Sequence, residues 1–185
     1  MQFYKTRKII LCSLFASLIS VGAFIKIPIP LVPFTLQFLI TNMAGLLLGS
    51  KLGFVSVMIY IMLGLIGVPV FAQGGGISYV LQPSFGYLIG FALGAFITGK
   101  ISKAFENNIS LKILLTASFS GLFIVYALGM IYYALISYFY LGTPIGLWPL
   151  FLYSFILAVP GDIVLCFVSA LLGKILIPIT KNLRS

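Results

Sequence analysis

Six long apolar runs dominate this chain and restrict what it can fold into. They cover residues 9–25, 34–48, 52–68, 85–97, 111–141 and 148–179. A hydrocarbon core about 30 Å thick is crossed by a helix of roughly 20 apolar residues, so runs of this length are typical of transmembrane helices. Since 62% of the residues are apolar and only 7% are charged, the chain lacks the polar surface of a water-soluble domain. We predict an all-α membrane protein with six transmembrane helices, formed as one domain over residues 1–185.

The basic residues predict how these helices are oriented. Lys and Arg concentrate in the cytoplasmic loops of membrane proteins. If the N-terminus is cytoplasmic, ten of the eleven basic residues lie inside and only Lys26 lies outside. We therefore expect both termini in the cytoplasm and a multi-pass protein of the cell membrane. A cleaved signal peptide is the alternative for residues 9–25, although no polar region follows this run before the prolines.

Most enzyme chemistry is excluded by the residues that are missing. There is no His, and Glu106 and Asp162 are the only acidic side chains. A paired-carboxylate site, a Ser-His-Asp triad and a His-ligated metal all need more than this. Residues 94–100 match the start of a phosphate-binding loop, but Ile101 follows where Ser or Thr is required. We predict no enzyme, no metal or cofactor and, because the charges flank apolar runs, no nucleic acid.

The three connections expected outside the membrane are rich in Pro, Gly and aromatic residues and nearly uncharged. They cover residues 26–35, 67–84 and 141–149. Apolar, non-helical backbone at a membrane is tolerated where protein buries it or where it lines a cavity. We predict that these loops cap a ligand pocket at the outer ends of the helices. Three tight interfacial turns without a site are the alternative.

Asp162 is the most informative single residue, because it lies inside the sixth apolar run just after Pro160 and Gly161. Ionisable groups inside a membrane face a cavity or a partner and mark functional sites. We predict that Asp162 accepts N–H bonds from a neutral polar ligand, with a structural Asp bonded to a neighbouring hydroxyl as the alternative. Amides, hydroxyls and one outer cation provide further candidate ligand contacts. These are Gln37, Gln73, Gln82, Ser84, Tyr87 and Lys26.

Small residues recur at a spacing of four and predict close helix packing. One row is Gly45, Gly49 and Gly53, and another is Gly86, Gly90, Gly94 and Thr98. The first apolar run has Cys12, Ala16 and Ser20 in a similar row, with Ser13 and Ser17 beside it. This face is suited equally to packing within the bundle and to contact with a partner protein.

Several segments resemble a known family in order and spacing. They cover residues 27–37, 45–53, 60–72, 86–91 and 160–162. The chain is similar to the BioY family, the biotin-binding substrate-capture (S) components of energy-coupling factor (ECF) transporters. The resemblance implies a six-helix S-component fold with a biotin pocket under the outer loops. It also implies a transmembrane coupling protein and two cytoplasmic ATPases as partners.

The resemblance also implies roles for particular residues. Asp162 matches the acidic residue that binds the ureido ring of biotin, and Ser13, Ala16, Ser17 and Ser20 match the face that contacts the coupling protein. The family commonly has Lys three residues after this Asp, whereas this sequence has Leu165. The function implied is capture of extracellular biotin for ATP-driven uptake across a bacterial plasma membrane. Another small vitamin or a precursor such as dethiobiotin, and a membrane assembly protein without a small ligand, are the alternatives.

Overall fold

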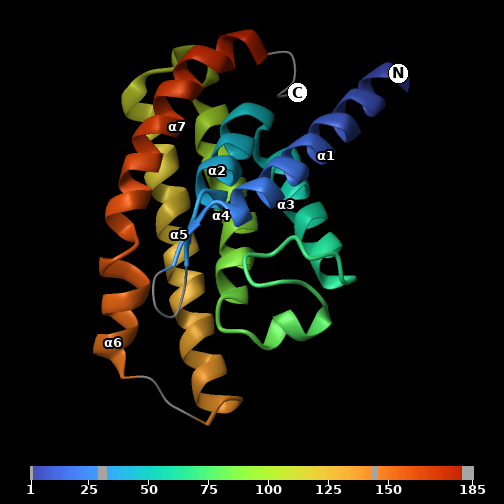
Figure 1. Ribbon diagram of the computed structural model, residues 1–185. Helices are drawn as coiled ribbons and strands as arrows, with labels where there is room; N and C mark the ends of the chain where they lie inside the picture. The colour runs from blue at the N-terminus through green and yellow to red at the C-terminus, as the bar shows by residue number, and fades with distance from the viewer. Residues whose placement is uncertain (1, 29–32, 143–145, 181–185) are drawn as a thin grey trace.

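Helices form most of the protein and pack as one bundle (Figure 1). The computed structural model describes residues 2–28, 33–142 and 146–180. The helices are α1 (Gln2–Phe24), α2 (Gln37–Leu48), α3 (Ser50–Leu65), α4 (Phe85–Ala104), α5 (Leu111–Phe139), α6 (Leu147–Phe151) and α7 (Val159–Thr180). Between them lie the paired strands β1 (Lys26–Ile27) and β2 (Phe34–Thr35), the 3-10 turns η1 (Ile77–Leu81) and η2 (Glu106–Asn108), and the π-helical turn η3 (Leu152–Ile156). The helical architecture predicted from the apolar runs is confirmed.

Among the described residues, four helices are long and apolar enough to cross a membrane by themselves. Their apolar segments are Thr6–Phe24, Phe85–Ala104, Leu111–Phe139 and Val159–Thr180. Helices α2 and α3 are shorter, with 12 and 16 residues, and a helix of 12 residues is only about 18 Å long. The chain passes directly from α2 to α3 at Gly49, where a φ of 82° favours glycine. The count of six membrane crossings stays a prediction.

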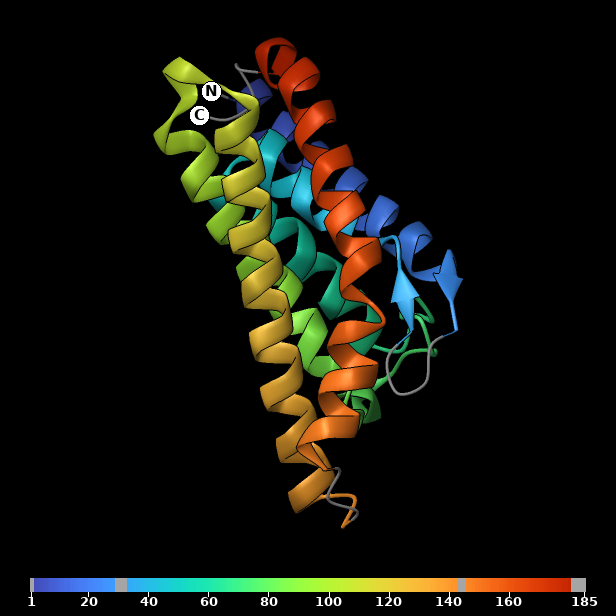
Figure 2. The same ribbon diagram turned by 90° about the vertical axis from the view of Figure 1, so that its left-hand side faces the viewer.

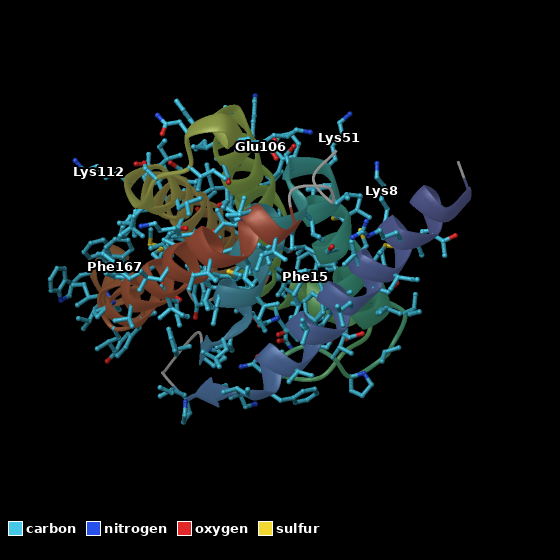
Figure 3. The ribbon with its side chains drawn as sticks, turned by 90° about the horizontal axis from the view of Figure 1, so that it is seen from above. Lys8, Phe15, Lys51, Glu106, Lys112 and Phe167 are labelled. Carbon is cyan, nitrogen blue, oxygen red and sulfur yellow. The ribbon has the colours of Figure 1, made fainter. Side chains whose placement is uncertain are left out.

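Basic side chains lie at one end of the bundle, called the basic end below. The start of α1, the end of α7, the α2–α3 turn and the α4–α5 connection lie at the same end (Figure 2). Figure 3 looks down on this end, near which Lys8, Lys51 and Lys112 are labelled. This grouping agrees with the prediction that both termini and most basic residues lie on one side of the membrane. That this side is the cytoplasm stays a prediction. Lys181 and Arg184 lie outside the described residues.

The sixth apolar run is not one continuous helix, which corrects the sequence prediction. Helix α6 ends at Phe151, the π-helical turn η3 follows, and α7 begins at Val159. The Leu157 N–H donates to the Leu152 carbonyl, five residues earlier, at 3.1 Å. Pro160 has no N–H to continue the ladder of hydrogen bonds. Asp162 therefore lies in the first turn of α7, next to an interruption of the helix.

Glycines allow neighbouring helices to approach closely. A Cβ atom at Gly45 of α2 would lie 2.5 Å from the Ala95 carbonyl oxygen of α4. One at Gly90 of α4 would lie 2.8 Å from the Cα of Val125 in α5. Both distances are too short for a side chain, so the predicted use of these glycines as packing positions is confirmed.

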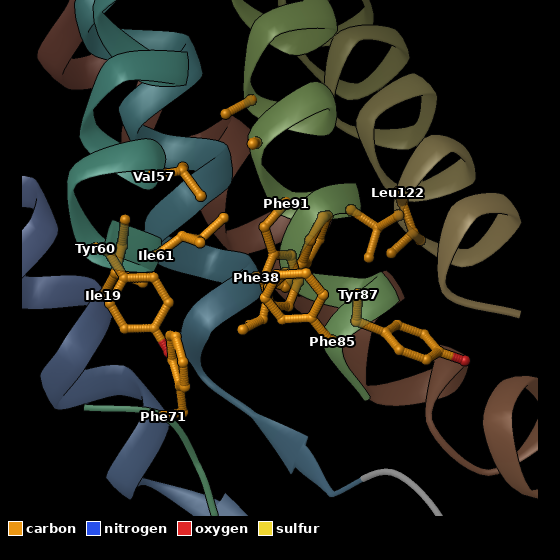
Figure 4. Packing of buried hydrophobic residues seen from close by; sticks show 14 of the residues in the cluster. Ile19, Phe38, Val57, Tyr60, Ile61, Phe71, Phe85, Tyr87, Phe91 and Leu122 are labelled. Carbon is orange, nitrogen blue, oxygen red and sulfur yellow. The ribbon is translucent and has the colours of Figure 1, made fainter. Parts of the chain in front are cut away.

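The buried hydrophobic residues form two clusters, one toward each end of the bundle. Leu46, Leu114 and Ile177 belong to the cluster toward the basic end. Aromatic residues dominate the other cluster, in which Phe71 lies against Tyr60 on one side and Tyr87 lies on the other (Figure 4). The candidate site lies within this aromatic cluster.

Candidate ligand-binding site

A cavity lies among α2, α4, α5 and the start of α7, beneath β2 and the connection over residues 66–84. The empty space at this cavity is about 600 Å³, a volume that includes open solvent at its mouth. Aromatic and aliphatic side chains form most of its wall, as in small-molecule sites generally. The lining residues are Pro33, Phe34, Thr35, Gln37, Phe38, Ala72, Tyr79, Ser84, Tyr87, Leu88, Phe91, Val125, Tyr126, Ala158 and Asp162.

Asp162 supplies the only carboxylate of this wall. Its side chain is 8% exposed, and the Tyr126 hydroxyl donates a hydrogen bond of 2.5 Å to its Oδ2. The Asp162 N–H donates to the Ala158 carbonyl at 3.2 Å, which ties the residue to the interruption between η3 and α7. No lysine or arginine lines the cavity within the described part of the chain. The carboxylate is therefore buried beside a neutral donor.

Gln37 connects the cavity to the capping connection through a chain of hydrogen bonds. Its Oε1 accepts from the Thr35 hydroxyl at 3.2 Å, and its Nε2 donates to the Tyr60 hydroxyl at 2.6 Å. Tyr60 in turn donates to the Val70 carbonyl at 3.3 Å. An amide has two donors and two acceptor positions, so Gln37 retains one of each for a ligand.

The capping connection over residues 66–84 is held down by aromatic side chains. Phe71 is 1% exposed and packs against Tyr79 with ring centroids 4.4 Å apart. The Tyr79 hydroxyl accepts from Ser84 at 3.5 Å, and burial raises the pKa of Tyr79 above its ordinary value. Tyr79 is therefore a neutral phenol at neutral pH, able to donate and to accept at the cavity wall.

The structure brings together four of the seven ligand-contact residues proposed from the sequence. Asp162, Gln37, Ser84 and Tyr87 line the cavity. Gln73, Gln82 and Lys26 are not among its lining residues. Lys26 is exposed and donates from Nζ to the Ala72 carbonyl at 2.7 Å, so its ammonium lies beside a residue of the cavity wall.

The candidate contacts chosen from the sequence left out three polar residues of the wall, Thr35, Tyr79 and Tyr126. Thr35 lies two residues before Gln37 and bonds to it, and this proximity in the sequence is the signal that could have identified it. Tyr126 lies in the middle of the long apolar run of α5, where an isolated Tyr gives no distinguishing signal. It reaches Asp162, 36 residues later, only through the packing of α5 against α7.

The small residues of α1 do not share one exposed face. Ala16 is 1% exposed and belongs to the protein's own core, whereas Ser13 and Ser17 are exposed and Ser20 is half-buried. The hydroxyls of Ser17 and Ser20 donate to the main-chain carbonyls of residues 13 and 16. Only the serines of this group are therefore directly accessible to a partner.

These features define a class of protein: a helical membrane protein with a capped small-molecule cavity near one end of its bundle. A sequence model of the BioY family matches residues 1–182. The chain belongs to the BioY family, and it is an integral membrane protein.

Known relatives match nearly the whole chain. "Probable biotin transporter BioY" of Lysinibacillus sphaericus is 43% identical over 181 residues, covering 98% of this chain and 92% of the relative. "Biotin transporter BioY" of Rhizobium etli is 35% identical over 181 residues, covering 92% of each. A crystal structure of the S-component for biotin from an ECF-type ABC transporter superposes with a TM-score of 0.80 at 26% identity, covering 95% of this chain and 93% of the other.

Proposed function

We propose that this protein is a substrate-binding S component that captures extracellular biotin for ATP-driven uptake by an ECF-type transporter. Relatives that match nearly the full length carry the name biotin transporter, and the structural neighbour is an S-component for biotin. The observation that carries the proposal is the capped, mainly apolar cavity with a single buried carboxylate, Asp162. Biotin offers matching chemistry, because its thioether ring and chain are apolar, with a neutral ureido group at one end and a carboxylate at the other.

In this proposal the ureido N–H groups bind to Asp162. The free Oδ1 accepts from the ligand, since Oδ2 already accepts from Tyr126. The remaining donor of Gln37, or the O–H of Tyr79, pairs with the ureido carbonyl. Neutral donors and acceptors are enough for the ureido group, so the leucine at position 165 leaves this group with partners. The carboxylate at the end of biotin's chain carries a charge that no cation of the described cavity wall balances.

The partners follow from the same proposal. A transmembrane coupling protein and two cytoplasmic ATPases supply the energy, and the chain itself works in a bacterial plasma membrane. Ser13 and Ser17 of α1 are exposed and small, which suits contact with the coupling protein. Ala16, which the resemblance assigned to the same contact, supports α1 from inside the bundle instead.

The proposal is tested by removing the carboxylate. We expect Asp162→Ala to abolish biotin binding in isothermal titration of the purified protein, while the variant remains inserted and folded. The matched control is Glu106→Ala, which removes the only other acidic side chain, in the α4–α5 connection at the basic end. Unchanged biotin affinity in Asp162→Ala contradicts the assignment of this residue.

Leu165 favours a second candidate, the same scaffold used for another small vitamin or for dethiobiotin. Its side chain belongs to the buried cluster around the cavity and offers no polar contact. Competition of labelled biotin by a panel of vitamins and precursors separates the two candidates. Absence of saturable binding for every compound favours an assembly protein without a small ligand.

A further inference from the structure

We propose that Tyr126 is a positioning residue that fixes the Asp162 carboxylate for the ligand, an inference that rests on the proposed biotin site. Its hydroxyl donates to Asp162 Oδ2 at 2.5 Å, and its ring is 4% exposed. Both residues line the cavity, one from α5 and one from the first turn of α7. The hydrogen bond therefore joins two helices at the wall where the ligand is recognised.

The Tyr126 ring is held from two directions. Tyr87 of α4 meets it edge to face, with centroids 6.1 Å apart and planes at 87°. Phe155 in η3 meets it at 5.3 Å and 78°. Such edge-to-face contacts are favourable arrangements for aromatic pairs. The hydroxyl is thus placed by packing before any ligand enters, and it sets the direction of the carboxylate.

Asp162 has few other groups that could hold it. Across the described ranges, Tyr126 is the side chain that donates a hydrogen bond to this carboxylate, and no cation lies within ion-pair distance. A carboxylate accepts at both oxygens, so occupation of Oδ2 leaves Oδ1 for an N–H of the ligand. A site with this division offers one carboxylate oxygen to an N–H donor of the ligand. Without Tyr126 the carboxylate loses its preferred rotation and its neutral partner.

The test is Tyr126→Phe, which keeps the ring and removes the hydroxyl. Misdirection of the carboxylate weakens the hydrogen bond that the ligand makes to it. Since loss of a hydrogen bond to a charged group corresponds to this range, we expect biotin to bind between about tenfold and about a hundredfold more weakly. The control is Tyr133→Phe, a buried tyrosine on the same face of α5, two turns further along and outside the cavity wall. Melting temperatures of both variants check that each remains folded.

A second measurement separates positioning from packing. The chain has only two acidic side chains, so the infrared band of the Asp162 carboxyl group is assigned by its loss in Asp162→Asn. We expect Tyr126→Phe to shift this band in the ligand-free protein and Tyr133→Phe to leave it in place. A purely structural role for Tyr126 does not move the band.

The outcomes are distinguishable. If wild-type protein binds biotin and Tyr126→Phe binds it equally well, the role of Tyr126 is refuted and the proposed function stands. An unmoved band refutes it as well, because the contact with Asp162 then carries no effect. If wild-type protein binds no biotin, the proposed function fails, and this role in biotin recognition fails with it.

Discussion

Replacing Phe71 by Ala tests whether one side chain anchors the capping connection over residues 66–84, called the cap below. Phe71 lies in the connection over residues 66–84 and is 1% exposed. Its ring packs against Tyr60 at 5.4 Å and Tyr79 at 4.4 Å, and a Cβ at Gly64 would overlap it. It also closes a small bridge, with its N–H donating to the Gly74 carbonyl at 2.9 Å. Truncation therefore leaves a void where the cap meets α3.

The magnitude follows from this burial. Phe→Ala at a fully buried position costs about 3–5 kcal/mol. If the lower cost, about 3 kcal/mol, reduces the free energy of local opening of the cap, the population of open molecules rises about a hundredfold. Each 1.4 kcal/mol is a factor of about ten. Amide groups that depend on the cap, such as the Gly76 N–H bonded to the Gly64 carbonyl at 2.7 Å, then exchange faster by the same factor.

Hydrogen–deuterium exchange of peptides from residues 66–84, followed by mass spectrometry in detergent or nanodiscs, measures this opening. The control is Ile77→Ala, which truncates a side chain of the same connection that is 73% exposed. We expect fast exchange in Phe71→Ala and wild-type exchange in Ile77→Ala, with the helices protected in both. Equal exchange in the two variants refutes the idea that Phe71 anchors the cap.

Two further predictions concern the wall and the mouth of the cavity. A Cβ at Gly129 would lie 2.6 Å from Tyr87 Cζ, so we expect Gly129→Val to displace that ring and weaken biotin binding at least about tenfold. Isothermal titration measures the loss, and retained affinity contradicts the packing argument. Because Lys26 is an exposed cation beside the cavity wall, we expect Lys26→Gln to slow the association of anionic biotin at low salt more than that of its uncharged amide. Stopped-flow fluorescence compares the two rates, and equal slowing argues against electrostatic attraction.

The fold was predictable to the extent that a membrane constrains it. Apolar runs of membrane length indicate helices whatever their neighbours are, and the glycine rows indicated where those helices touch. The interruption before α7 was only hinted at by Pro160 and Gly161, since a Pro-Gly pair is compatible with a kink, a π turn or a full break. The pairing of β1 with β2 had no sequence signal, because each strand has only two residues.

The site was predictable where a residue was chemically out of place. Asp162 stands out because a carboxylate inside an apolar run demands a partner. Tyr126 does not, since tyrosine is common in membrane helices and its partner is fixed only by tertiary packing. Gln73 and Gln82 illustrate the opposite case, because the direction of a loop side chain depends on how the loop folds. Here both glutamines lie in the connection that Phe71 and Tyr79 hold down.

Lys26 and Asp162 differ in burial, so we expect them to affect different steps of biotin binding. Lys26 is exposed, so its field reaches into solvent and is screened over a distance of about 8–10 Å at physiological salt. Its effect belongs to the encounter, and it should fade as salt rises. Asp162 is buried against Tyr126, so salt scarcely reaches it, and the loss of its hydrogen bonds should appear in the dissociation rate. We therefore expect that raising the salt concentration lowers the association rate of biotin with the wild-type protein and leaves the dissociation rate unchanged. This result would follow if Lys26 attracts biotin from solution and Asp162 holds the bound molecule.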